Sequence, residues 1–228
     1  MVVQDNGVVY FMGGGGEDNY YGGRSGIPQN WNGGLHYSNK FNNSKQILNS
    51  GYKISKVNSP SGERTYTTNF VGDSSFSSNK ITSGFSSKLK QSLNVSFETN
   101  IDSSNSLKFT ARGNLNNTKS NSTYNLQSLN SKLLLINNSS RTTSSTIDNS
   151  ALNTNLLWKH KFKKLARTLT INASYNLSNS NTDSYLFSKN DYYDNGIPYR
   201  IDTTDQENKR ENKSNTFATT ITYTEPLA

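Results

Sequence analysis

Residues 31–54 read WNGGLHYSNKFNNSKQILNSGYKI and decide the fold, because two alternating segments flank one polar turn. Every second residue of 31–41 leans apolar or aromatic, and the residues between them are Asn, Gly, His, Ser and Lys. After the polar residues 42–45, the alternation resumes on one parity with Leu48, Tyr52 and Ile54. Because side chains of a β-strand alternate between two faces, this period of two predicts a β-hairpin.

The same alternation recurs along the chain. Apolar residues share one parity in the second strand of the hairpin and in five further segments: 46–57, 85–99, 106–116, 150–162, 167–177 and 215–223. The intervening positions are mostly Ser, Thr, Asn, Lys and Arg. A helix would need apolar residues three and four apart, and these segments lack that spacing. The sequence therefore predicts an all-β fold with seven strands.

The connections between these segments alternate in length. The short ones are 42–45, 100–105 and 163–166, whereas the long ones are 58–84, 117–149 and 178–214. Short turns centred near 43, 103, 164 and 225 are separated by 60, 61 and 61 residues. This alternation predicts an antiparallel up-and-down meander with every long loop at the same end.

Composition narrows what the two faces of such a sheet can contact. Only 31% of the 228 residues are hydrophobic and the mean hydropathy is -0.79, while Asn and Ser make up about three residues in ten. Aromatic residues reach 11%, which argues against plain disorder. A β-barrel with a polar lumen and a thin apolar outer belt has this composition, with short periplasmic turns and longer external loops. No apolar run approaches the ~20 residues of a membrane helix.

Aromatic residues gather near the predicted short turns, where a periplasmic girdle of such a barrel is expected. These residues are Phe41, Phe97, Phe109, Trp158, Phe162 and Tyr223. His160 shares the parity of Trp158 and Phe162 and is expected to lie with them.

Closure of the barrel is the difficulty. Seven strands are an odd number, and an open sheet would leave unpaired edges in lipid. We therefore expect residues 30–228 to form part of a larger outer-membrane barrel, with about seven transmembrane strands. Residues 1–29 are expected to be a Gly-rich loop or the remnant of a preceding strand around 8–11. No signal peptide is recognisable after Met1.

Four stretches resemble the large outer-membrane β-barrel proteins of Bacteroidota, the TonB-dependent-receptor-like group. The stretches are FMGGGG with GIPQNWNGGLHYSNKF, then NIDSSNSLKFTARGN, LLWKHKFKKLARTLTINASYN and TITYTEPL. They span residues 11–227, and the third combines a strand, a basic turn and a return strand. The resemblance implies a receptor or transporter wall in the cell outer membrane, with external ligand-recognition loops. Its partners would be outer-membrane lipid, the remainder of the barrel with its plug, and an external ligand.

Motifs for phosphate or metal chemistry are weak in this chain. Gly13–Gly16 with Gly22-Gly23 lacks the Lys-Ser/Thr of a phosphate-binding loop, which favours a plain loop. His36 and His160 fall on different predicted strands without metal-ligand spacing. Asp191–Gly196 lacks the alternating ligands of a calcium loop, so a Tyr-rich turn or ligand-contacting loop is favoured over a calcium site.

No arrangement for catalysis is recognisable. Cysteine is absent, which excludes thiolate sites and cysteine nucleophiles. Serine is abundant but no GxSxG motif occurs, and no acid/base pair of carboxylates stands out. We expect no enzyme activity and assign no catalytic, cofactor-binding or metal residue.

Two other functions are open from the residues alone. A secreted Ser/Asn-rich adhesion or binding module, built as a β-sandwich or solenoid, would be a water-dispersed β-protein. A nucleic-acid surface would use the net charge of +8, but the Lys and Arg residues are scattered without a long stripe. We therefore expect no nucleic-acid partner.

Overall fold

The computed structural model describes residues 7–11, 26–71 and 74–225, and all of its regular structure is β-strand. The strands are β1 (Gly7–Phe11), β2 (Gln29–Phe41), β3 (Gln46–Val71), β4 (Ser74–Asn100), β5 (Asn105–Asn130), β6 (Leu135–Lys161), β7 (Thr168–Asp194) and β8 (Ile197–Thr224). Each predicted strand lies within or overlaps one of β2–β8. The all-β prediction is confirmed.

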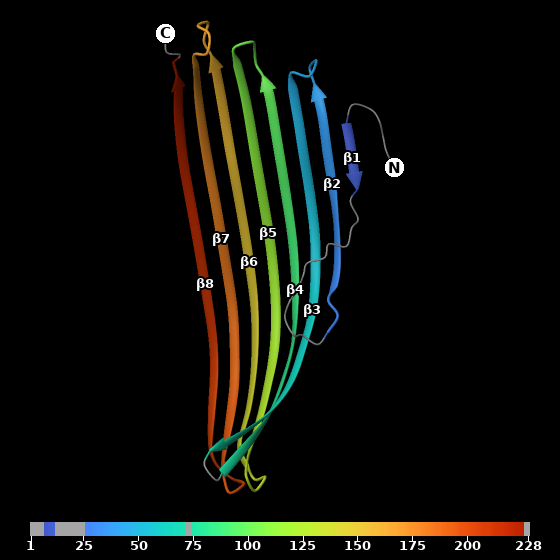
Figure 1. The fold of residues 1–228 in the computed structure, drawn as a ribbon, viewed down its shortest axis with the longest axis vertical. Helices are drawn as coiled ribbons and strands as arrows, with labels where there is room; N and C mark the ends of the chain where they lie inside the picture. Colours follow the sequence, from blue (N-terminus) through green and yellow to red (C-terminus); the bar gives the residue numbers. More distant parts are fainter. Residues whose placement is uncertain (1–6, 12–25, 72–73, 226–228) are drawn as a thin grey trace.

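The strands form one open sheet in chain order from β1 to β8, and every neighbouring pair is antiparallel (Figure 1). The predicted up-and-down meander is therefore confirmed. The seven long strands are the predicted ones, and β1 adds a five-residue strand that pairs with β2 from Gly7 opposite Asn39 to Phe11 opposite Leu35. Among the described residues, no hydrophobic side chain is buried and no second layer covers either face of the sheet.

Short connections join the strands at the end where β2 meets β3, which we call the short-turn end. The turns there comprise residues 42–45, 101–104 and 162–167, close to the predicted positions. Asn42, Asn43 and Ser44 all have positive φ angles near 50–65°. Asn adopts this left-handed region more readily than most residues, which suits the tetrad to a tight turn.

The predicted long loops are wrong. Most of residues 117–149, 178–214 and 58–84 continues as paired strands, with one register shift at Ser128/Leu129 and another at Tyr192/Tyr193. Tight connections replace the loops, at 131–134 between β5 and β6 and at Asn195-Gly196 between β7 and β8, where the φ angles are 50° and 81°. An Asn-Gly pair with two positive φ angles is the common two-residue hairpin turn. The expected Tyr-rich turn at Asp191–Gly196 is thus the end of β7 and its hairpin.

The extension has a physical reason in the composition of these segments. Residues 117–149 contain no Gly and no Pro, and are rich in Thr, Ser and Asn. Because both faces of β5 and β6 are mainly polar over these residues, no apolar alternation marks the strands, although their backbone ladder continues. We call the part of the sheet alongside β2 the near half and the remainder the far half.

Candidate functional site

The register brings the apolar residues of all seven long strands to one face. The ladders of the near half contain no register shift, so directly opposed residues share a face across the whole sheet. One such row runs Leu35, Tyr52, Leu93, Gly113, Leu152, Leu177 and Asn215. We call the face that carries this row the apolar face and the opposite one the polar face.

The apolar residues of the near half gather in a band on this face, in which Lys56 lies between Trp31 and Leu89, and Gln91 between Ile54 and Leu115. Its members are Trp31, Leu35, Tyr37, Phe41, Leu48, Tyr52, Ile54, Leu89, Leu93, Val95, Phe97, Leu107, Phe109, Ala111, Leu115, Leu152, Leu156, Trp158, Leu169, Ile171, Ala173, Tyr175, Leu177, Phe217, Ile221 and Tyr223. We call this set the apolar band.

No described residue covers the band. Leu93 is 46% exposed, Leu115 is 55% exposed and Ile221 is 66% exposed. Soluble proteins rarely expose large contiguous apolar patches, and those that do mark interaction sites for protein or membrane. The band spans seven strands and is therefore a candidate interaction surface.

The band runs obliquely across the strands. Its boundary toward the far half lies at Phe217 on β8, whose row leads through Tyr175 and Val95 to Tyr37 on β2. On β2 the band continues six residues further, to Trp31. The boundary moves six residues along the strand direction, at ~3.4 Å each, while it crosses six strand spacings of ~4.8 Å. It is therefore inclined by about 35° to the row.

The boundary at the short-turn end is inclined in the same sense. Phe97 is the last band residue of β4, and its row leads to Thr219 on β8. On β8 the band continues four residues further, to Tyr223. Four residues over four strand spacings again give about 35°. From β4 to β8 this boundary follows the same inclined direction as the other, whereas Phe41 on β2 lies two residues nearer the turn than the row of Phe97.

The six aromatic residues predicted near the short turns lie at that end of the molecule, and the five on strands all lie on the apolar face. The imidazole of His160 stacks on Trp158 with 5.8 Å between ring centroids, and it meets the edge of Phe162 at 4.6 Å. Phe162 contacts Tyr223 in turn, at 6.1 Å. The predicted placement of His160 with Trp158 and Phe162 is thus confirmed, and its Nδ1 lies 2.8 Å from Asn105 Oδ1.

Charged residues fasten the same end of the sheet. Glu225 Oε1 accepts hydrogen bonds from Lys164 Nζ and Arg167 Nη2, each at 2.7 Å, so the end of β8 is tied to the 162–167 turn. These bonds, with one from the Tyr223 hydroxyl, lower the pKa of Glu225 to about 2. In the 101–104 turn, hydrogen bonds from the Asn105 side chain and from the Ser104 and Asn105 backbone lower the pKa of Asp102.

The polar face of the near half has a different chemistry. Its rows consist mainly of Ser, Thr and Asn, and cross-strand hydrogen bonds join several of them, including Ser38 to Asn49 at 2.6 Å. Its only acidic residue is Glu98, which pairs with Lys108 at 2.6 Å. Its basic residues are Lys40, Lys53, Lys88, Lys90, Lys108, Arg112, Lys159, Lys161 and Arg210.

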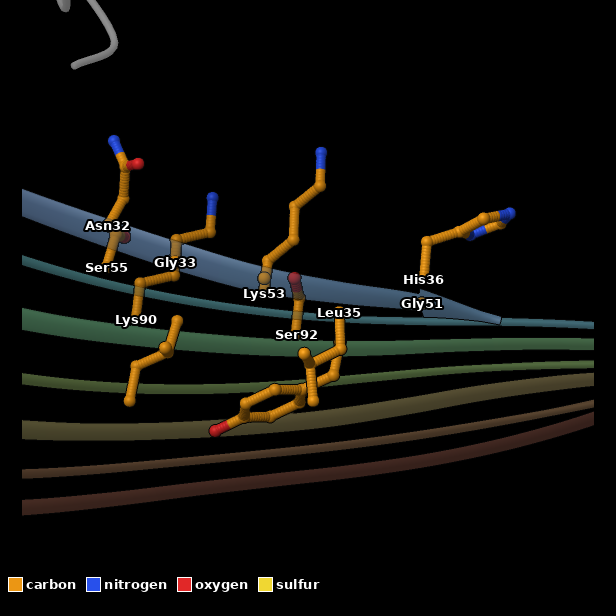
Figure 2. Close-up of a pocket in the computed structure, with 12 residues that line it drawn as sticks. Asn32, Gly33, Leu35, His36, Gly51, Lys53, Ser55, Lys90 and Ser92 are labelled. Atoms are coloured by element: carbon orange, nitrogen blue, oxygen red, sulfur yellow. The ribbon is translucent and has the colours of Figure 1, made fainter. Parts of the chain in front are cut away.

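A groove of about 630 Å³ lies along the backbone of β2, β3 and β4. Lys53, Lys90, Asn32 and His36 border it and project to the same side of the sheet, whereas Leu35 projects to the other (Figure 2). Gly34 and Gly51 also border it, opposite Lys53 and His36 respectively. The missing side chains of these two glycines leave room beside the lysine on the polar face.

The structure separates the residues considered for metal chemistry. His36 lies on the polar face of β2 and His160 on the apolar face of β6, so the two do not share a site. In residues 7–11, 26–71 and 74–225, no group of three or more His, Asp and Glu is placed to hold a metal ion. The glycines at 13–16 and 22–23 lie outside the described residues. The described part also contains no helix that could span a membrane.

Two features of this surface were not predicted from the sequence. The inclination of the apolar band depends on the register of six ladders, and alternation within single strands does not contain that register. The collection of cations on one face was visible only as scattered Lys and Arg. A parity count over the predicted strands would have found it, because Lys53, Lys88, Lys90 and Arg112 each oppose the apolar parity of their strand.

Comparison with protein-family models, curated proteins and solved structures finds no match to this chain.

Proposed function

We propose that the near half of the sheet is a segment of an outer-membrane β-barrel wall, with the apolar band facing lipid and the polar face lining the lumen. The observation that carries the proposal is the inclined band on an uncovered face. Strands of outer-membrane barrels tilt by about 35–45° from the barrel axis, so a belt parallel to the membrane is inclined by that angle to rows drawn perpendicular to the strands. The inclination of about 35° found here fits this range.

The height of the band also supports this assignment. Within the near half, the band on β4 extends from Leu89 to Phe97, which is about 27 Å at ~3.4 Å per residue, and Phe85 lies on the same face four residues beyond Leu89. Inclined by 35°, this length gives a belt about 22 Å high, close to the ~25 Å of known outer-membrane barrels. The rings of Trp158, Phe162 and Tyr223 border the belt at the short-turn end, where an interfacial girdle would lie.

The free edge of β8 requires a partner in this setting. No described strand pairs with its outer edge over residues 197–224. Backbone groups left unpaired in lipid cost several kcal/mol each, so a barrel must close. We propose that further strands of the barrel pair with this edge, supplied by the same protein or by another copy.

The proposed role is that of a receptor or transporter wall, in line with the resemblance to TonB-dependent-receptor-like proteins. The polar far half would project outward beyond the membrane as paired ribbons, where an external ligand could contact it. The alternative of a secreted sandwich needs a second sheet over the apolar face, and the described residues form a single layer. We therefore prefer the barrel to the sandwich or solenoid.

Flotation with lipid tests the proposal. The full chain is refolded with phosphatidylcholine vesicles, centrifuged through a density gradient and washed with alkaline carbonate. We expect the chain to float and to resist the wash. The double variant Leu93→Asn/Leu152→Asn should float poorly, whereas the polar-face control Asn94→Ser/Asn153→Ser should float like the parent. A monodisperse monomer that stays out of the vesicles without detergent would overturn the proposal.

A further inference from the structure

Most of the excess positive charge of the described residues lies on the polar face of the near half. The whole chain has 24 Lys and Arg and 16 Asp and Glu. Nine basic residues and one acidic residue lie on this face, whereas the other described residues comprise 14 basic and 11 acidic ones. A surface with one sign of charge raises the local concentration of ions of the opposite sign.

Three of these cations are neighbours on β3 and β4. Lys88 and Lys90 are two residues apart on β4, and Lys53 on β3 lies opposite Ser92, the next polar-face residue after Lys90. We call Lys53, Lys88 and Lys90 the lysine cluster. Lys53 and Lys90 border the groove of about 630 Å³ and point to the same side of the sheet (Figure 2).

The cluster has no acidic counterpart in the structure. Among the described residues, no carboxylate lies within ion-pair distance of any of the three lysines. The neighbouring rows present Ser55, Ser92 and Asn94, which can donate or accept hydrogen bonds but carry no charge. Arg112 adds another cation opposite Asn94, to which its Nε donates at 2.9 Å.

Like charges at adjacent positions of a sheet repel one another, and a bound anion of charge two or more relieves that repulsion. Lysine binds phosphate as a point charge, and the hydroxyl and amide groups around the cluster supply further donors. We propose that the lysine cluster binds a small multivalent anion of the phosphate or polyphosphate class. The position of this site inside a barrel lumen rests on the proposed function, whereas the binding itself rests on the cluster.

Titration calorimetry of the full chain in a zwitterionic detergent, with pyrophosphate as the probe, tests the inference. We expect saturable binding that weakens as salt rises. The variant Lys53→Gln/Lys88→Gln/Lys90→Gln should bind at least about tenfold more weakly, a loss of about 1.4 kcal/mol. Lys56→Gln/Lys119→Gln/Lys213→Gln removes the same charge from the apolar face and should bind within about threefold of the parent.

Absence of binding by the parent, or an equal loss in the apolar-face variant, would overturn the inference. Circular dichroism of each variant establishes that its β-structure is intact, and Lys90→Gln alone replaces the triple variant if it is not. A second arm replaces pyrophosphate with vesicles containing phosphatidylglycerol. Cluster-dependent binding to these vesicles with none to pyrophosphate would overturn the assignment to a small soluble anion.

The same experiments separate this inference from the proposed function. If the chain binds pyrophosphate through the cluster but does not float with vesicles, the anion site is supported and its position in a barrel lumen is rejected. If the chain floats but does not bind pyrophosphate, the barrel wall is supported and the anion site is rejected.

Discussion

Phe97 on β4 and Phe109 on β5 lie directly opposite each other on the apolar face, in the row that ends at Thr219 on β8. On β4 this row is the boundary of the apolar band at the short-turn end, whereas on β8 the band passes four residues beyond it. The row of Phe97 and Phe109 therefore ends the band on β4 but not on β8, as expected for a belt that is inclined to the rows. A flat sheet packed on a second sheet has no need of such an inclination.

A charge placed in the band should be far more costly than the same charge on the polar face. Leu156→Arg puts a guanidinium in the middle of the band on β6, and Asn153→Arg puts it on the opposite face of the same strand. We expect Leu156→Arg to lower the free energy of unfolding in vesicles by about 2–4 kcal/mol. Asn153→Arg should change it by about 0.5 kcal/mol or less. Urea unfolding followed by tryptophan fluorescence measures both, and equal effects would count against a lipid-facing band.

The far half should be hydrogen-bonded although the sequence predicts long loops there. Residues 117–130 and 135–149 pair in a ladder between β5 and β6, with one register shift at Ser128/Leu129. We expect their amide hydrogens to exchange much more slowly than those of an unpaired loop, because exchange requires opening of the ladder. Hydrogen exchange with mass spectrometry measures this on peptides from the two segments. Exchange as fast as in an unfolded peptide would restore the loop interpretation.

The hairpin between β7 and β8 depends on glycine. Gly196 has a φ of 81°, a conformation that costs an L-residue with a side chain about 1 kcal/mol. We expect Gly196→Ala to lower the free energy of unfolding by that amount. Gly113→Ala is the matched control, because an added Cβ there meets no atom within 4 Å and the backbone is ordinary strand. Denaturant unfolding in detergent compares the two variants, and an equal loss in both would contradict the turn geometry.

The contacts of Glu225 should make the end of β8 sensitive to acid. Its pKa is about 2 in the folded chain, below its ordinary value of 4.5. Because the folded-state pKa is the lower one, the carboxylate stabilises the fold above about pH 4.5, and this contribution disappears as the pH falls toward 2. We expect its carboxyl carbon, followed by NMR, to titrate near pH 2. Titration near 4.5 would show that Lys164 and Arg167 do not form hydrogen bonds with the carboxylate. The variant Glu225→Gln should lack this dependence of stability on pH.

Alternation of apolar and polar residues was enough to predict the near half. The seven strands, their antiparallel order and the short turns follow from it, because one face of each strand is apolar there. The placement of His160 beside Trp158 and Phe162 followed from parity alone. These predictions succeed where the two faces of a strand differ in chemistry.

The far half could not be predicted in the same way because its two faces are alike. Strands such as 117–130 carry Ser, Thr and Asn on both parities, so apolar periodicity is absent. The turn between β7 and β8 was nevertheless signalled by Asn195-Gly196, and the absence of Gly and Pro from 117–149 is in keeping with strand there. The inclination of the band needed the cross-strand register, which depends on pairing between residues far apart in sequence.

The most direct measurement uses nitroxide labels on single cysteines, which is straightforward because the chain has no Cys of its own. In vesicles, we expect labels at Leu89, Leu93 and Phe97 to be accessible to oxygen in the lipid, and those at Lys90, Asn94 and Ser96 to be accessible to a water-soluble nickel reagent. Asn215 lies in the same row as Leu93, but outside the inclined band on β8, so its label should be in water. No alternation along β4, or equal depth at Leu93 and Asn215, would contradict the lipid-facing inclined belt.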